Sequence, residues 1–398
     1  MSRKTDAHQS LAQGFLLPEL RLLQTAYAKG SGSMELRVEK TSPMEVCPRC
    51  ATPSWSIYDR RWVKVRDSPV RAKRVTLSIR KRRFSCKPCG KPFTEPVAGI
   101  RKGSRCTERF RKYILWACER FGDLKAVRDE LRCSAGLLYK TWYAELERKR
   151  RTRQYPWPEV IGVDEHFFRK SKAGYRSFVS VVTDIKNKRF MEVVDGTRIS
   201  DLEAQLRDIP GRENVKQVVM DMTGSFRGFA QRFFPNAERI ADKFHVVKLL
   251  HPAIMRRQRE LLSNERPPGY RTLLRNGRDL SPKTRWVLKD FLRGYPALLE
   301  LWEAKEAIHR LYRCRGYKLA KKSFTRLLGR LAKSELPELQ TLRNTLVKWR
   351  VEVLNYFRYR VTNARTEGFN NKAKVVKRRA YGYRSFGNYR LRVLNACS

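Results

Sequence analysis

The middle of the chain, between residues 159 and 242, alternates short apolar runs with helical patterns. Runs rich in β-branched and apolar residues predict five strands, at residues 160–163, 175–183, 189–194, 217–221 and 237–241. Helical patterns separate the last three of these runs. They span residues 200–206, with Ser200 as the N-cap, and residues 224–233.

This element order is three meandering strands followed by helix, strand, helix and strand, as in the ribonuclease-H-like fold. It predicts an α/β core that begins with residues 159–242 and in which the first and fourth strands are neighbours. Residues 243–362 are almost continuously helical, which predicts an all-α insertion into this core. Residues 363–398 then supply the last part of the core, with a polar helix and a basic C-terminus.

Three smaller segments are predicted before residue 150. Residues 1–42 are expected to form an arm, with a short helix at 15–28 and a strand at 34–40. Strands at 62–66 and 75–84 are expected within a module that spans 43–98. Between 104 and 150 the spacing predicts helices at 107–121, 124–131 and 135–148, the last two capped by Asp123 and Ser134. These two helices and their turn fit a helix-turn-helix DNA-binding module, and a plain helical linker is the alternative.

Composition points to a polyanionic partner. The chain of 398 residues carries 87 Lys and Arg against 39 Asp and Glu, a formal net charge of +48. Such an excess favours double-stranded DNA. A membrane surface is the rival, but the sequence holds no apolar run of about 18 residues and no dominant basic amphipathic helix. We also find no export signal, so we expect a protein of the reducing cytosol.

Two Cys-x-x-Cys pairs lie in the module at 43–98, Cys47 with Cys50 and Cys86 with Cys89. Each pair can direct two thiolates at one ion. Two pairs complete a tetrahedral four-sulfur Zn²⁺ site that is closed and therefore structural. The spacing predicts a zinc ribbon, and reduced thiols without metal are the alternative.

Two of the predicted strands end in a carboxylate, at Asp164 and Asp221. A carboxylate in that position is costly to desolvate unless it is paired or binds a cation. A third acid, Glu367, lies near the start of the polar helix, and spacing alone does not distinguish it from Glu352. Three such oxygen ligands suit hard cations such as Mg²⁺ or Mn²⁺. Acids clustered in a basic chain predict metal-dependent chemistry on a nucleic-acid backbone.

Four motifs carry a resemblance to a known family: IGVDEHF, VVMDMTGSF, ADKFHVVKLL and NARTEGFNNKAKVVKRRAYGYRSFGNYRLRVL. Through them the chain resembles bacterial insertion-sequence transposases of the DDE class, and it is most similar to the ISL-three family. The resemblance implies that Asp164, Asp221 and Glu367 are the catalytic triad and the ligands of the catalytic metal. It also matches Asp242 and His245 to the Asp-x-x-His signature of transposases with helical insertions. We expect these two residues to brace the insertion against the core.

The resemblance implies DNA cleavage at the ends of the insertion sequence and strand transfer by a two-metal mechanism. One ion would activate a water or a 3′-hydroxyl, the other would stabilise the leaving oxygen, and Asp164 would bridge them. Transposases of this class generally act as dimers or higher assemblies, because two element ends must be held together. The expected location is the bacterial cytoplasm, in association with the nucleoid when DNA is bound.

Several side chains are predicted to contact DNA phosphates or bases. They are Arg80, Lys81, Arg82 and Arg83 in the ribbon, Tyr139 and Lys140 in the helix-turn-helix, and Asn371, Lys374, Lys377, Arg378 and Arg379 after Glu367. A solvated surface is the alternative for any such run. Strand alternation turns Glu165 away from Asp164 and places His166 on its side, where it could touch a phosphate or simply pack. In the insertion, Trp286, Trp302 and Trp349 fit a packed core better than base stacking.

Two further functions stay open at this stage. A domesticated, catalytically inactive relative would bind element ends without cutting them, although the three acids are all present. A nuclease or resolvase of the same fold would seldom need both a zinc ribbon and a helix-turn-helix module. The favoured prediction is therefore an active transposase.

Overall fold

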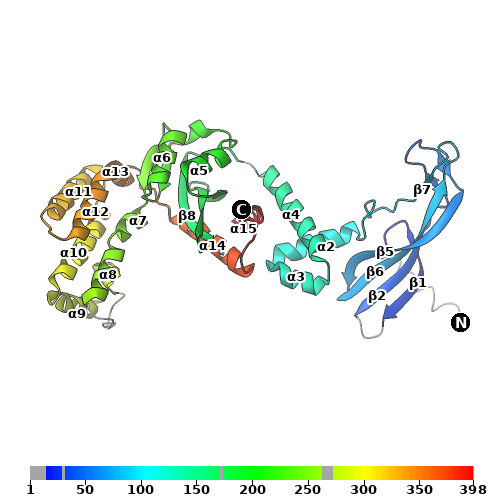
Figure 1. Cartoon of the computed structure of the whole chain (residues 1–398), viewed down its shortest axis with the longest axis horizontal. Coiled ribbons are helices and arrows are strands. Elements are labelled where there is room, and N and C mark those ends of the chain that lie inside the picture. The colour runs from blue at the N-terminus through cyan, green and yellow to red at the C-terminus, as the bar shows by residue number, and fades with distance from the viewer. Residues whose placement is uncertain (1–14, 29–31, 154, 171–173, 262–271, 398) are drawn as a thin grey trace. The chain divides into compact units, whose positions relative to one another are not determined.

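The computed structural model describes residues 15–28, 32–153, 155–170, 174–261 and 272–397. The chain divides into two compact units, Met1–Glu145 and Leu146–Ser398 (Figure 1). Each unit has its own hydrophobic core. Within the described ranges, no helix has the length and apolarity needed to cross a bilayer.

A five-stranded sheet forms the base of the first unit. Its strands are β1 (Leu20–Ala28), β2 (Ser33–Lys40), β5 (Ile57–Val70), β6 (Lys73–Ser85) and β7 (Pro92–Thr94). The strand order is β1-β2-β6-β5, and β7 pairs with β6. The β2–β6 pair is parallel, and the others are antiparallel. The segment predicted as an arm therefore contributes two strands to the sheet, and residues 1–14 of that arm lie outside the described chain.

The helix predicted at residues 15–28 is wrong, because most of that segment is strand β1. Its backbone pairs with β2 from Leu20↔Lys40 to Ala28↔Ser33. Pro18 lacks the N–H donor that a helix interior requires. The neighbouring Leu16 and Leu17 are buried in the core of the sheet instead of on a helical face. The strand predicted at 34–40 is confirmed as β2.

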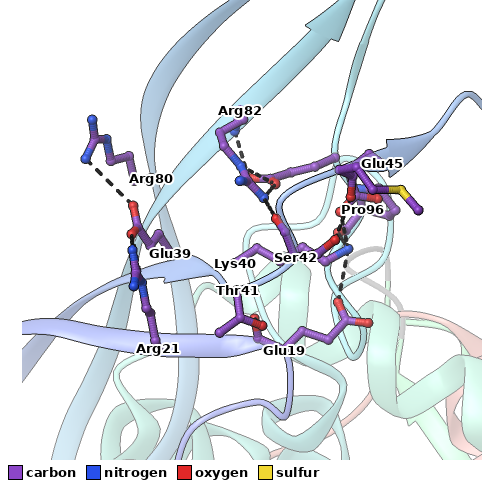
Figure 2. A network of polar contacts seen from close by, with 12 residues as sticks. Glu19, Arg21, Glu39, Lys40, Thr41, Ser42, Glu45, Arg80, Arg82 and Pro96 are labelled. Carbon is purple, nitrogen blue, oxygen red and sulfur yellow. Dashed lines mark hydrogen bonds and ion pairs between the residues drawn. The ribbon is translucent and has the colours of Figure 1, made fainter. Parts of the chain in front are cut away.

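A network of polar contacts ties β1 and β2 to β6 (Figure 2). Arg80 Nη1 lies 3.7 Å from Glu39 Oε2. Arg82 Nε donates to Glu95 Oε2 over 2.9 Å, and its Nη2 donates to Ser42 O over 2.7 Å. Glu95 is fully buried, so Arg82 neutralises a charge that would otherwise be unpaired in the interior.

Three helices follow the sheet: α2 (Glu108–Phe121), α3 (Leu124–Leu131) and α4 (Ala135–Thr152). Thr107 and Asp123 accept backbone N–H groups at the starts of α2 and α3, as good N-caps do. Arg132 adopts a left-handed conformation and makes the short turn between α3 and α4. The predicted helices are confirmed, and α4 ends four residues beyond its predicted end at residue 148.

The second unit holds another five-stranded sheet, with the order β10-β9-β8-β11-β12. Its strands are β8 (Val160–Lys170), β9 (Arg176–Asp184), β10 (Arg189–Asp195), β11 (Gln217–Met220) and β12 (Glu238–Ala241). The β8–β11 and β11–β12 pairs are parallel, while β8–β9 and β9–β10 are antiparallel. The prediction that the first and fourth strands are neighbours is confirmed by the β8–β11 pair.

Two details of this unit differ from the prediction. β8 continues to Lys170, so Asp164 lies inside a strand and not at its end. The antiparallel partner β9 keeps pairing with β8 beyond Asp164 and supplies the backbone partners for that extension. Helix α5 (Ile199–Leu206) has Arg198 as its N-cap instead of Ser200, because Asp201 Oδ2 accepts the Arg198 N–H. Helix α6 (Gly224–Phe233) begins and ends as predicted.

Helices cover both faces of this sheet. One core joins α5 and α6 to the sheet and continues into α7 (Lys243–Lys248), α8 (His251–Leu261), α9 (Pro282–Arg293), α10 (Pro296–Leu311), α11 (Tyr317–Ala332), α12 (Pro337–Lys348) and α13 (Arg350–Tyr359). A separate core joins β8, β9 and β10 to α14 (Ala364–Arg379) and α15 (Phe386–Cys397). The sheet is therefore sandwiched, with α14 and α15 on the face opposite α5 and α6.

Candidate active site and metal centres

Asp164 and Asp221 meet at one level of the sheet. The parallel register pairs Val163 of β8 with Met220 of β11, so the residue after each is an aspartate at the same height. Both side chains are buried, with exposed fractions of 8% and 6%. Ligand atoms of Asp164, Asp221 and His245 of α7 all lie within 4.8 Å of one another. We call these three residues the acid–histidine group.

Electrostatics in the acid–histidine group favour a cation. Burial, reinforced by the neighbouring Asp221, raises the pKa of Asp164 to about 7, and the same two causes raise the pKa of Glu165. Burial lowers the pKa of His245, but its contacts with Asp221 and Asp242 outweigh that effect and raise it to about 10. Positive charge is thus stabilised beside the two carboxylates.

The donor set fits a hard divalent ion. His245 Nδ1 lies 2.8 Å from Asp221 Oδ1, in ion-pair range, and this buried oxygen has no hydrogen bond of good geometry from the described residues. A buried carboxylate oxygen with only one close polar neighbour still has a lone pair for a cation. Two carboxylates and an imidazole converge here, and an ion bound by all three would displace the proton of the imidazole.

Asp242 repeats the position of the two aspartates on the next strand. β12 is parallel to β11 with Met220 opposite Ala241, so Asp242 follows its strand at the same level as Asp221. Asp242 Oδ2 lies 3.2 Å from His245 Nδ1, and its Oδ1 accepts the Asn363 N–H over 2.9 Å. It therefore links the start of α7 to the start of α14. The closeness of His245 to Asp221 was not predicted, although the apolar run before Asp242 carries the same signal as the other two strands.

Glu367 is not in the acid–histidine group. It lies in the first turn of α14 and is exposed. Two buried neighbours on the same helix reach the site: Asn363 Nδ2 donates to Val163 O over 3.0 Å, and Asn370 Nδ2 donates to Asp164 Oδ2 over 2.6 Å. Glu367 lies one turn from each of them, so it borders the site without touching its acids.

The other candidate for a third acid, Glu352, has a different partner. It is fully buried in α13, and its Oε1 lies 2.7 Å from Arg227 Nε and 3.7 Å from Arg239 Nε. His166 is also buried, where it bonds to Asn370 and Tyr389, and burial lowers its pKa to about 4. Neither side chain is placed to touch a phosphate in this conformation.

The four predicted zinc ligands converge in the first unit. Ligand atoms of Cys47, Cys50, Cys86 and Cys89 all lie within 4.8 Å of one another. The Cys47–Cys89 and Cys50–Cys86 sulfur distances are 4.0 and 3.4 Å, close to the edge of about 3.8 Å expected for a tetrahedron of Zn–S bonds of about 2.3 Å. Hydrogen bonding between Cys50 and the side chain of Thr52 lowers the pKa of Cys50 to about 6, which favours the thiolate. The cluster fits a structural Zn²⁺.

All but one of the predicted DNA contacts fall into two classes. Some already have partners within the protein. Arg80 and Arg82 belong to the network of Figure 2, Arg83 pairs with Asp59, and Lys377 donates to the carbonyls of Phe167 and Phe168. Others are exposed: Tyr139, Lys140, Asn371, Lys374, Arg378 and Arg379. Lys81 is half-buried, and burial lowers its pKa.

Two of the three tryptophans singled out in the insertion are core residues. Trp302 and Trp349 are buried at 7% and 3% exposure, whereas Trp286 is 67% exposed.

Comparison with known proteins gives consistent matches. Residues 161–393 match the family model of ISL-three DDE transposases, described as "Transposase", and residues 43–89 match the "zinc-finger of transposase IS204/IS1001/IS1096/IS1165". The chain is 25% identical over 367 residues to the transposase for insertion sequence element IS1001 of Bordetella parapertussis, with 88% of each chain covered. A 60-residue stretch is 42% identical to an ATP-dependent protease of Lactococcus lactis subsp. lactis. That stretch is 15% of this chain and 19% of that protein, which is too little to bear on function.

Proposed function

Because the chain belongs to the ISL-three family of DDE transposases, we propose that it binds the ends of its insertion sequence and catalyses metal-dependent cleavage and strand transfer of DNA. The observation that carries the proposal is the pair of buried aspartates, Asp164 and Asp221, held side by side by two parallel strands. Two buried carboxylates this close stay ionised together only with a cation beside them, and otherwise one of them takes up a proton.

We propose a ribonuclease-H-like catalytic core made of residues 159–242 and 363–398, with residues 243–362 as its helical insertion. The strand order and the helices on both faces of the sheet support this division. In it, the zinc ribbon at 43–98 and the helices at 104–150 are DNA-binding modules, and residues 1–42 form a further N-terminal segment.

The proposed ligands of the catalytic metal are Asp164, Asp221 and Glu367. Bound Mg²⁺ or Mn²⁺ would activate a water or a DNA 3′-hydroxyl and stabilise the leaving 3′-oxygen. Asp164 and Asp221 are fixed by burial, and Asp221 Oδ1 has a lone pair free for a ligand. Glu367 lies one turn from Asn363 and Asn370, which both contact β8, and in this proposal its side chain turns to the acids when the metal binds. His245 orients Asp221 through their close contact.

Double-stranded DNA is the proposed partner of the exposed polar and basic side chains. Tyr139 and Lys140 lie exposed on α4, and Asn371, Lys374, Arg378 and Arg379 form an exposed track on α14 beyond Glu367. We place the protein in the bacterial cytoplasm, on the nucleoid, as a dimer or higher assembly, since two element ends must be joined.

A catalytically inactive DNA-binding protein is the second candidate function. The observation in its favour is that Glu367 lies outside the acid–histidine group. If the third carboxylate never reaches the metal, the protein would bind element ends without cutting them.

A cleavage assay on duplexes that carry the element's ends separates the two functions. Wild type would be compared with Asp221→Asn and with a matched control, Asp208→Asn, whose carboxylate is exposed. Mg²⁺ would be omitted in the blank instead of chelated, because a chelator would also strip the zinc.

We expect wild type and Asp208→Asn to nick the ends only with Mg²⁺, and Asp221→Asn to bind but lose at least about 100-fold in rate. Wild type that binds the ends and never cuts them, with Mg²⁺ or Mn²⁺, would favour the inactive protein. Normal cutting by Asp221→Asn would show that the active site lies elsewhere.

A further inference from the structure

The face of α14 that meets β8 carries a chain of buried side-chain hydrogen bonds ending on Asp164. We propose that Asn370 is a positioning residue that fixes both the Asp164 carboxylate and the register of α14, and that His166 and Tyr389 hold it in place. This inference rests on the proposed function, in which Asp164 is a metal ligand.

The chain links three segments that are distant in the sequence. Asn370 Nδ2 donates to Asp164 Oδ2 over 2.6 Å, and Asn370 Oδ1 lies 3.0 Å from His166 Nδ1. On its other side, His166 Nε2 bonds to the Tyr389 hydroxyl of α15. All four side chains are at least nine-tenths buried.

Hydrogen-bonding chemistry sets the direction of the chain. An ionised Asp164, the form that holds a cation, can only accept, so the Asn370 amide must present its NH₂ to it. The amide oxygen then faces His166, which requires the proton on Nδ1 and leaves Nε2 to accept from Tyr389. Each group therefore donates toward Asp164, in the order that the hydrogen-bond partners assign. Aligned donors polarise one another, which strengthens the last bond, the one on the carboxylate.

The second Asp164 oxygen is fixed as well. Asp164 Oδ1 accepts the Glu165 N–H over 2.7 Å. With one hydrogen bond on each oxygen, the carboxylate cannot rotate freely, and its remaining lone pairs keep one direction. A ligand held in one orientation binds its metal without losing rotamer entropy on binding.

The same contact sets where Glu367 lies. Asn370 is three residues after Glu367 on α14, so anchoring Asn370 to Asp164 also fixes the turn that carries the proposed third ligand. Asn363, one turn before Glu367, is the second anchor, because its Nδ2 donates to Val163 O. The first and third ligands are thereby coupled through one amide side chain.

Mn²⁺ binding to the full-length, zinc-loaded protein tests this role, together with the Mg²⁺ concentration that gives half-maximal end cleavage. The variants are Asn370→Ala, His166→Asn, His166→Phe and Tyr389→Phe. His166→Asn keeps a donor near the Nδ1 position, whereas His166→Phe removes both bonds. Tyr383→Phe is the control: it removes the hydroxyl of a neighbouring ring, 5.3 Å from Tyr389 between centroids, that is outside the chain.

We expect Asn370→Ala to weaken Mn²⁺ binding about 10- to 100-fold and to raise the half-maximal Mg²⁺ concentration in parallel. His166→Phe should approach this effect, His166→Asn should recover part of it, and Tyr389→Phe should cost about threefold. Tyr383→Phe should leave the metal dependence unchanged. Thermal unfolding of each variant separates loss of the fold from loss of metal affinity.

Two results would overturn the inference. In the first, the Asn370 and His166 variants are less stable but bind Mn²⁺ as wild type does. The hydrogen bonds would then contribute to stability alone and not to metal binding. The other is an equal effect of Tyr383→Phe and Tyr389→Phe. Asp164→Asn identifies the level of failure: if it binds Mn²⁺ and cuts normally, the proposed function itself is wrong.

Discussion

Gly162 lies on β8 where α14 packs closest to the sheet. A Cβ at this position would lie 2.2 Å from Asn363 Oδ1 and 2.4 Å from Thr366 Oγ1. Both are buried on the inner face of α14, so they have little room to move aside. We predict that Gly162→Ala lowers the free energy of unfolding by about 1–3 kcal/mol and reduces end cleavage as α14 shifts from β8. Denaturant melts and the cleavage assay measure the two effects.

Gly329→Ala is the control for that substitution. Gly329 lies within α11, and a Cβ there would meet no atom within 4 Å. Alanine should be neutral or stabilise the helix by about 0.5–1 kcal/mol. Equal behaviour of the two alanine variants would contradict the close approach at Gly162.

At the scale of residues, the sequence was enough to predict Asp164 and Asp221 as site residues. It was not enough to predict which side chains surround them. An apolar run that ends in a carboxylate is a local pattern, so both acids could be predicted. The contacts of His245 depend on strand register, and the contact of Asn370 with Asp164 joins residues 206 positions apart in the sequence. No local pattern encodes such pairings, and only the motif resemblance indicated that these segments meet.

At the scale of elements, the clearest prediction concerns the two Cys-x-x-Cys pairs of the first unit. We predict that Cys86→Ser removes zinc and weakens binding to the element's ends. A tetrahedral site of four sulfurs is incomplete when one of its thiolates is lost, so it no longer holds the ion. Mn²⁺ binding by the second unit should persist, since all four cysteines lie in Met1–Glu145. Metal analysis by mass spectrometry and titration with labelled DNA measure both. Cys314→Ser, at a half-buried thiol outside the cluster, is the control.

One zinc per chain in Cys86→Ser would contradict that assignment. At the scale of elements, the sequence predicted α6 and β6 to within two residues at each end, whereas for β5 it predicted only residues 62–66 of Ile57–Val70. It failed at β1, because a short apolar segment fits either a helix or a strand and only pairing with β2 decides between them. It also ended β8 too early, since the extension depends on β9.

For the whole molecule, the net charge of +48 predicts that binding to the proposed DNA partner depends on salt, but it does not identify which basic side chains make the contacts. The ion pairs within the fold divide the basic side chains into two groups, those with an acidic partner and those exposed to solvent. Arg82 is held by the buried Glu95, whereas Lys374 and Arg378 are exposed on α14. Glu95 follows strand β7 and lies outside the basic run that contains Arg82. The ion pair could therefore not be predicted from that run alone.

This division predicts opposite phenotypes for two kinds of basic residue. Lys374→Ala and Arg378→Ala should each weaken DNA binding and reduce the slope of log affinity against log salt by about one, with unchanged stability. Arg82→Ala should leave Glu95 buried and unpaired, and should destabilise the first unit by about 3–5 kcal/mol. Anisotropy titrations over a salt series and denaturant melts separate these outcomes. A stable Arg82→Ala variant with a reduced salt slope would mean that Arg82 leaves Glu95 to bind phosphate, and that the internal pair yields to DNA.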